Sequence, residues 1–90
     1  MKRFRSYFGT LMQRHLTLRR SLGYLLVNAE YTLREFDRFL HQAYPGARRV
    51  TRQIVADYLE TTRSLASSTR HDRLANLRQF CRFLFLFDTV

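Results

Sequence analysis

Arginine is the residue type of this sequence whose chemistry is easiest to define. Only Lys2 among the 16 basic residues is a lysine, so the other fifteen are arginines, and against seven acidic residues they give a formal net charge of +9. An arginine guanidinium can bind a phosphate group through two parallel hydrogen bonds. The charge of this short chain therefore predicts a polyanionic partner, either a nucleic acid or an anionic membrane surface.

Hydrogen-bonding side chains accompany the arginines on the polar faces of two expected helices. Near the C-terminus, Thr69, Asp72, Arg73 and Asn76 share one face of a helical wheel. The polar face of an earlier helix is made of Tyr24, Val27, Asn28, Tyr31, Arg34, Glu35 and Arg38. Any one of these residues could simply belong to a solvated surface. Together they form mixed surfaces that could contact base edges as well as phosphates.

Residues that could support catalysis or hold a cofactor form no recognisable pattern. The three histidines lie in separate expected helices and Cys81 lies on an apolar stripe, so no cluster of metal ligands is expected. The three glycines are isolated, which excludes a glycine-rich phosphate loop. The carboxylates are few, and no two of them pair at helical spacing on a face that resembles a pocket. The sequence therefore predicts no catalytic residue, no cofactor and no metal ion in this chain.

Four helices must position these side chains, and we expect them at about residues 6–22, 25–43, 51–63 and 68–87. Gly23 suits a left-handed C-cap after the first helix, and Pro45 ends the second. Thr51 is expected to cap the third helix, and serine or threonine at the start of the fourth caps its first turn.

Apolar residues recur at three- and four-residue intervals along each expected helix. The core residues predicted from the first two helices are Phe8, Leu11, Met12, His15, Leu16, Leu18, Leu22, Leu25, Leu26, Ala29, Leu33, Phe36, Phe39, Leu40 and Ala43. Those predicted from the last two are Ile54, Val55, Tyr58, Leu59, Leu74, Leu77, Phe80, Cys81, Leu84 and Phe85. The expected fold class is all-α, with residues 1–90 forming one compact four-helix bundle.

We expect no targeting or membrane-spanning segment from this sequence. The first residues are basic, but no apolar stretch of signal-peptide length follows them. The longest apolar run, residues 83–87, is far too short to cross a bilayer. One cysteine excludes a disulfide framework and fits a reducing compartment. We therefore expect a cytoplasmic location and no membrane partner.

Several loose motifs occur in an order that is typical of one known domain. LASST at residues 65–69 is followed by RLANLRQFCRFL at residues 73–84. VTRQIVADYL at residues 50–59, LRRSLGY at residues 18–24 and the run from Leu33 to Leu40 match further motifs. From about Phe8 to Asp88, the sequence resembles the N-terminal core-binding, or SAM-like, domain of the tyrosine recombinase (phage integrase) family. The resemblance implies an orthogonal arrangement of the four helices.

The resemblance also implies a role in DNA recombination and integration. In this family, a four-helix domain and a separate C-terminal catalytic domain close around duplex DNA, with the second and fourth helices across the major groove. The implied partners are double-stranded DNA, the catalytic domain of the same parent protein, which lies outside this chain, and other recombinase protomers on DNA. The implied DNA-binding residues are Tyr24, Asn28, Tyr31, Arg34, Arg38, Ser68, Thr69, Asp72, Arg73 and Asn76.

Two further points follow from the comparison with the family, one a departure from its pattern and one an expected surface. Many members carry a threonine and a tyrosine four residues apart early in the second helix, where this sequence has Leu25 and Ala29. Surfaces of the first and last helices meet neighbouring protomers or the partner domain in the family. An exposed apolar patch is therefore expected from some of Phe83, Phe85, Leu86 and Phe87.

Two other classes of protein remain open. A helix-turn-helix module would join two helices by a turn of about three or four residues, and the best candidate linker, residues 44–50, is longer than that. A helical protein-interaction or membrane-surface domain could use the same arginines and phenylalanines.

Overall fold

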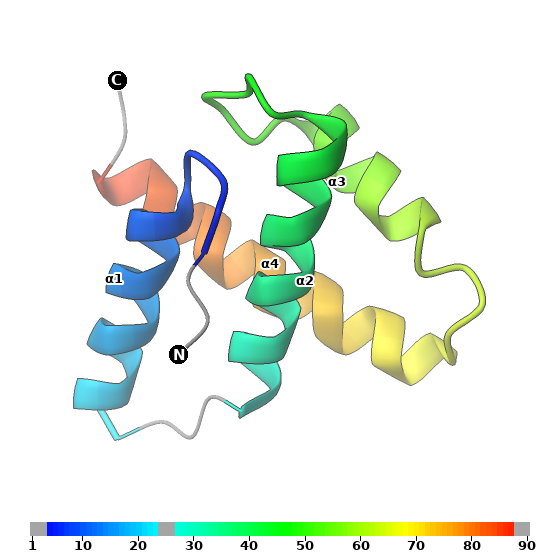
Figure 1. Ribbon diagram of the computed structural model, residues 1–90. Coiled ribbons are helices and arrows are strands. Elements are labelled where there is room, and N and C mark those ends of the chain that lie inside the picture. The colour runs from blue at the N-terminus through cyan, green and yellow to red at the C-terminus, as the bar shows by residue number, and fades with distance from the viewer. Residues whose placement is uncertain (1–3, 24–26, 88–90) are drawn as a thin grey trace.

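Four helices make up the chain as the structure, a computed structural model, describes it over residues 4–23 and 27–87 (Figure 1). They are α1 (Gly9–Ser21), α2 (Val27–Ala43), α3 (Arg52–Glu60) and α4 (Ser67–Phe87). No strand occurs within these described residues, and the all-α fold class is confirmed.

Two helix ends differ from the prediction by three residues, because the flanking residues form turns. α1 begins at Gly9 rather than at residue 6, since the Gly9 N–H donates to the Ser6 carbonyl in a tight turn. α3 ends at Glu60 rather than at residue 63. There the Thr61 and Thr62 hydroxyls donate to the carbonyls of the preceding turn, and this local pairing competes with continuation of the helix.

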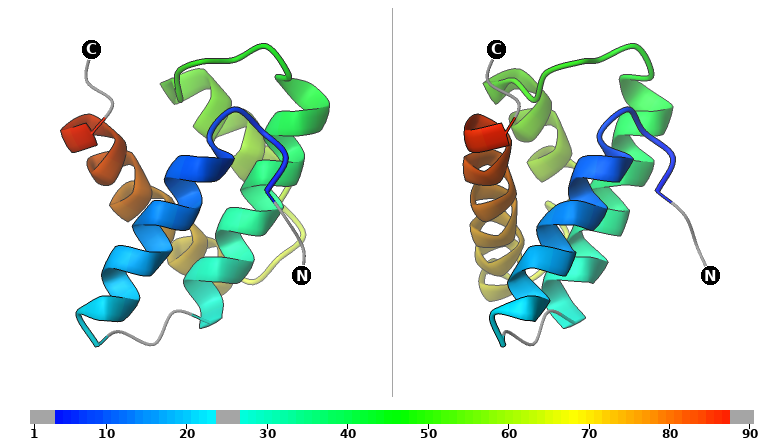
Figure 2. Two further views of the ribbon diagram at one scale, coloured as in Figure 1. Left: turned by 60° about the vertical axis from the view of Figure 1, so that its left-hand side comes forward. Right: turned by 90° about the vertical axis from the view of Figure 1, so that its left-hand side faces the viewer.

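The helices pack as an antiparallel pair crossed by a third helix. α1 and α2 lie side by side and run in opposite directions, and α4 crosses both of them (Figures 1 and 2). α4 contacts both α1 and α2, most extensively α2. α3 and the loop after it close one end of the arrangement (Figure 1). The polar faces of α2 and α4 are thereby brought to neighbouring positions.

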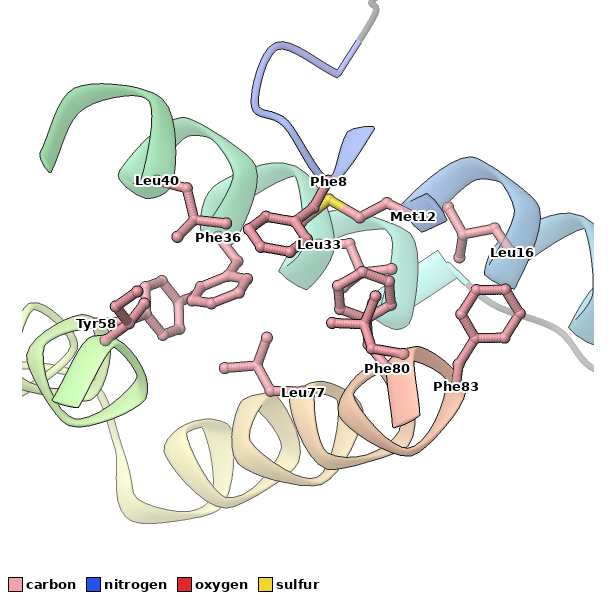
Figure 3. Close-up of a cluster of buried hydrophobic side chains, with 12 residues drawn as sticks. Phe8, Met12, Leu16, Leu33, Phe36, Leu40, Tyr58, Leu77, Phe80 and Phe83 are labelled. Carbon is pink, nitrogen blue, oxygen red and sulfur yellow. The ribbon is translucent and has the colours of Figure 1, made fainter. Parts of the chain in front are cut away.

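The core lies where these helices meet, and Figure 3 shows side chains from all four pointing into it. Its buried apolar residues are Phe8, Met12, Leu16, Leu33, Phe36, Leu40, Ile54, Tyr58, Leu77, Phe80, Phe83 and Leu84. Aromatic contacts connect the helices within it, such as the edge-to-face pair of Phe36 and Tyr58 with ring centroids 5.2 Å apart.

The apolar pattern of α1 overestimates how far the core extends. Leu18 and Leu22 were predicted to be buried but are 43% and 66% exposed. At this end of α1 it is Arg19 and Arg20, rather than the leucines, that face the neighbouring helices, where they bond to Gln79 of α4 and Glu30 of α2. Ala43 is likewise exposed at the end of α2. The predicted core residues Leu25 and Leu26 lie outside the described residues.

The buried stripe of α4 is rotated relative to the prediction. Phe80 and Phe83 face the core, while Leu74 and Cys81 are only half-buried. This rotation arises because α1 and α2 both contact α4 on the flank that carries the two phenylalanines (Figure 3). Burial of Phe83 also removes it from the expected exposed patch. The other three side chains of that patch, Phe85, Leu86 and Phe87, lie outside the described side chains.

A buried carboxylate of α2 holds the segment before α1 in place through hydrogen bonds. Asp37 is 5% exposed and accepts hydrogen bonds from the backbone N–H groups of Arg5, at 2.7 Å, and Ser6, at 2.8 Å. Phe4 then packs so closely on Gly9 that a Cβ there would lie 2.7 Å from the Phe4 Cβ. The fold therefore depends on a glycine at this approach.

The predicted helix caps are confirmed at two positions. Gly23 has φ +91°, a conformation that favours glycine, and its N–H donates to the Arg20 carbonyl at 3.0 Å. The Thr51 hydroxyl oxygen accepts a hydrogen bond from the Ile54 N–H at 3.2 Å.

Candidate nucleic-acid interface

The polar faces of α2 and α4 meet at two tyrosines and an arginine, which we call the tyrosine–arginine cluster: Tyr31, Tyr58 and Arg73. Arg73 of α4 lies over the Tyr31 ring of α2, with its guanidinium carbon 5.1 Å from the ring centroid. The same guanidinium donates a hydrogen bond from Nη1 to the Tyr58 hydroxyl of α3 at 3.2 Å. Arg73 is therefore held in place by side chains from two other helices.

The environment of the cluster keeps Tyr58 neutral and Arg73 charged. Tyr58 is 2% exposed, and this burial raises the pKa of its hydroxyl, although the hydrogen bond from Arg73 opposes the change. Tyr31 is 55% exposed, and Arg73 is half-buried beside it. Within the described residues no carboxylate is ion-paired with Arg73. The cation is thus available to an anion from solution.

Tyr58 is the member of the cluster that the sequence does not reveal as a site residue. Its position on the apolar stripe of α3 predicts burial, and its ring indeed packs against Phe36 and Phe39. The sequence does hold one sign of this role, which is a tyrosine rather than a phenylalanine at a core position. A buried hydroxyl needs a hydrogen-bond partner, so such a tyrosine indicates a polar neighbour. The sequence pattern does not identify that partner as Arg73.

Arg34 is held by a carboxylate on its own helix. Its Nε and Nη2 atoms lie 3.1 and 3.0 Å from Oε2 of Glu30, and Arg20 at the end of α1 pairs with the same carboxylate. Hydrogen bonding from Arg34 lowers the pKa of Glu30, and Arg20 adds to this effect. The Arg34 guanidinium also lies over the Phe4 ring, 4.8 Å from its centroid. These contacts connect α1, α2 and the N-terminal segment.

The other predicted site residues are spread along the two helices. Arg38 is mostly exposed and pairs with Glu35 at 2.9 Å, one turn away on α2. The exposed residues at the start of α4 are Ser68, Thr69 and Asp72. At the start of α2 Asn28 is also exposed, whereas Asn76 of α4 is half-buried. Tyr24 lies outside the described residues. Among the predicted residues that the structure describes, Tyr31 of α2 and Arg73 of α4 are brought into contact across the two helices.

Two further arginines have structural partners. Arg70 donates to the Thr62 hydroxyl at 3.2 Å and to the Leu59 carbonyl at 3.4 Å, so it connects α4 to the last turn of α3 and to the loop after it. Arg48, in the loop between α2 and α3, lies over the Tyr7 ring at 4.6 Å.

The described residues offer no candidate site for catalysis or for metal binding. These residues contain no group of three or more histidine, cysteine or acidic side chains that could hold a metal ion. Burial raises the pKa of the Cys81 thiol, which favours the protonated and less reactive form. Nor does the described part of the chain include a helix with the length and apolar character needed to span a membrane.

The fold and the site together define a small, strongly cationic four-helix domain whose second and fourth helices share a polar surface. Comparison with known families identifies the family within this class of protein. The family described as "Phage integrase, N-terminal SAM-like domain" matches residues 13–86, and the chain belongs to this family. The SAM-like fold and the suspected relation to recombinases are thereby confirmed. In integrases this domain is the non-catalytic part.

One curated relative supports the same assignment. The chain is 33% identical over 88 residues to a protein of Sinorhizobium fredii (strain NBRC 101917 / NGR234) that carries the name integrase/recombinase y4rE. The aligned region covers 98% of this chain but only 28% of the relative, so the chain spans less than a third of that protein's length. No solved structure matches the chain. Membership in the family indicates a role in DNA binding by an integrase or recombinase.

Proposed function

We propose that this domain binds duplex DNA as the N-terminal half of a clamp in a site-specific tyrosine recombinase and so supports DNA integration and recombination. The observation that carries the proposal is the contact between Arg73 of α4 and Tyr31 of α2. This contact puts a charged guanidinium and an exposed aromatic ring on the surface shared by the two helices. In such a clamp the catalytic residues belong to a second domain of the parent protein, and the complex forms with other protomers on DNA in the cytoplasm.

The residues of this surface suit different parts of a DNA duplex. Arg73 and Arg34 could contact a phosphate or a guanine edge, and Asn76 could read an adenine. The exposed hydroxyls of Ser68 and Thr69, with the N–H groups that open α4, could bind a phosphate. Arg38 is a further candidate for a backbone contact, because its pairing with Glu35 is exposed and easily exchanged for a phosphate.

The proposal is tested by fluorescence anisotropy with a mixed-sequence duplex of about 20 base pairs across a range of salt concentrations. If about five phosphates are neutralised, the slope of log K against log salt should be about −4 to −5. Arg73→Ala should weaken binding about tenfold and make the slope shallower by about 1. A slope near zero for the unmodified protein would contradict the proposal.

The matched control is Arg63→Ala, which removes the same charge from an exposed ion pair with Glu60 after α3. It should change the affinity much less than Arg73→Ala does. Equal losses for the two variants would show that net charge, rather than the surface of α2 and α4, determines binding. Selection of bound sequences from a random duplex library then tests whether the domain prefers particular bases.

A further inference from the structure

A second surface of the domain, formed by α3 and α4, has a different chemical character. It is a groove of about 620 Å3, which we call the α3–α4 groove, and it is lined by Val50, Thr51, Arg52, Val55, Ala56, Leu59, Leu74, Leu77, Arg78, Cys81 and Arg82. Most of these side chains are apolar. None of the nine described residues predicted to bind DNA lines the groove.

The groove exists because α4 carries apolar side chains on two flanks. One flank places Phe80 and Phe83 in the core. The other presents Leu74 and Cys81, which the sequence pattern predicts to be buried but which are half-exposed in the groove. On the facing side, Val55 and Leu59 of α3 are also only half-buried. In the described part of the chain this apolar floor has no covering element.

Three arginines line the α3–α4 groove beside its apolar floor. Arg52 is the first residue of α3, and Arg78 and Arg82 lie four residues apart on α4. All three are exposed, and among the described residues none of them is ion-paired. Like charges at this helical spacing repel each other, so a bound group that carries negative charge would relieve the repulsion.

We infer that the α3–α4 groove binds an amphipathic helix of a partner protein, whose apolar stripe covers the floor and whose aspartate and glutamate residues pair with the three arginines. An apolar stripe in a groove, flanked by complementary charges, is a common mode of helix recognition. This inference is independent of the DNA-binding proposal, because it concerns other residues.

The charge of the groove argues against two other occupants. DNA phosphates would suit the arginines but would leave the apolar floor uncovered. A second copy of this chain offers α1, which has exposed apolar residues in Leu18 and Leu22. However, α1 carries Arg14, Arg19 and Arg20 and no acidic residue, so it would be repelled by the same arginines.

Cys81 provides a direct reporter of occupancy, because it is the chain's one cysteine and it lines the groove. The probe is a synthetic helical peptide of about 20 residues with leucines at positions i, i+3, i+4 and i+7 and glutamates beside them. When about nine-tenths of the domain is bound, Cys81 should react about tenfold more slowly with a thiol reagent at mildly alkaline pH. A peptide with lysines in place of the glutamates, and one with the leucines scattered around the helix, should give no protection.

Charge reversal then distinguishes this site from the overall charge of the protein. Arg78→Glu and Arg82→Glu should each weaken binding of the acidic peptide about tenfold, while Arg14→Glu on α1 should leave it nearly unchanged. Equal losses for all three variants, or equal protection of Cys81 by the lysine peptide, would overturn the inference. So would protection of Cys81 in the unmodified protein by duplex DNA or by anionic lipid vesicles but not by the acidic peptide. The peptide comparisons need no variant, so they remain decisive if a variant fails to fold.

Discussion

At the scale of single residues, the central feature is an arginine that is held in position before any ligand binds. Arg73 is stacked on Tyr31 and bonded to the Tyr58 hydroxyl. Fixing the side chain in advance lowers the conformational entropy that it would lose on binding. Sequence patterns identify Arg73 and Tyr31 as polar surface residues, but they do not reveal Tyr58, because helical periodicity reports the burial of a ring and not the partner of its hydroxyl.

Tyr58→Phe tests this positioning. It keeps the ring that packs on Phe36 and removes the hydroxyl that receives the Arg73 hydrogen bond. We expect the affinity for duplex DNA to fall by about 1 kcal/mol, roughly fivefold, and the melting temperature to fall by a few degrees, because the same hydrogen bond joins α3 to α4 in the free domain. Tyr44→Phe is the matched control, because its hydroxyl donates instead to Asp57. If both variants bind DNA as the unmodified protein does, Tyr58 has no positioning role.

The burial of His15 predicts that the stability of the domain depends on pH. It is 5% exposed, packs against the rings of Phe80 and Phe83, and has no hydrogen-bond partner for Nδ1 among the described residues. Burial, with a smaller contribution from the charge of Arg19, lowers its pKa from 6.5. The unfolded chain therefore binds the proton more tightly. Stability from this group is complete above pH 6.5 and is lost as the pH falls through the window below it.

The expected result is a fall of a few degrees in the melting temperature between pH 7 and about pH 5. His15→Phe should flatten the curve in this window, since it removes the proton-binding group. The exposed histidines serve as controls, and His41→Phe should leave the curve unchanged. A pH dependence that persists in the His15 variant would contradict this assignment. Glu30 does not interfere, because its pKa lies below 4.5.

At the scale of the helices, periodicity predicts which elements form but not which flank of each helix is covered. The four helices follow from apolar spacing, and the caps at Gly23 and Thr51 follow from local backbone and side-chain chemistry. By contrast, α4 has apolar residues on two flanks, so the pattern could not determine whether Phe83 or Cys81 would enter the core. Packing against α1 and α2 decides this, and that packing is a property of the whole fold.

The N-terminal segment offers an element-scale prediction. Asp37→Ala removes the acceptor for the N–H groups of Arg5 and Ser6. We expect the free energy of unfolding to fall by about 1–3 kcal/mol, because two partly buried donors lose their partner. Urea denaturation measures this loss, and hydrogen exchange at residues 5 and 6 should become faster. Asp72→Ala, at an exposed carboxylate, should change stability by no more than about 0.5 kcal/mol.

At the scale of the whole molecule, the domain presents two surfaces of different chemistry. One is the shared polar surface of α2 and α4, which we assign to DNA. The other is the α3–α4 groove, which we assign to a protein partner. Charge and resemblance to a family predict the first, since the arginines and polar residues lie openly on helix faces. The groove could not be predicted, because it depends on half-buried residues of α3 and α4 that the pattern places in the core.

The proposed function depends above all on α2 and α4 together forming the DNA-binding surface. The most direct test is to titrate the isotope-labelled domain with a duplex of about 20 base pairs and to follow the amide chemical shifts of each residue. We predict that the largest changes fall on residues 28–38 and 68–76 and that they saturate together. Changes concentrated on α1, or on the groove residues within 50–59 and 77–82, with residues 28–38 and 68–76 unperturbed, would contradict the proposed function.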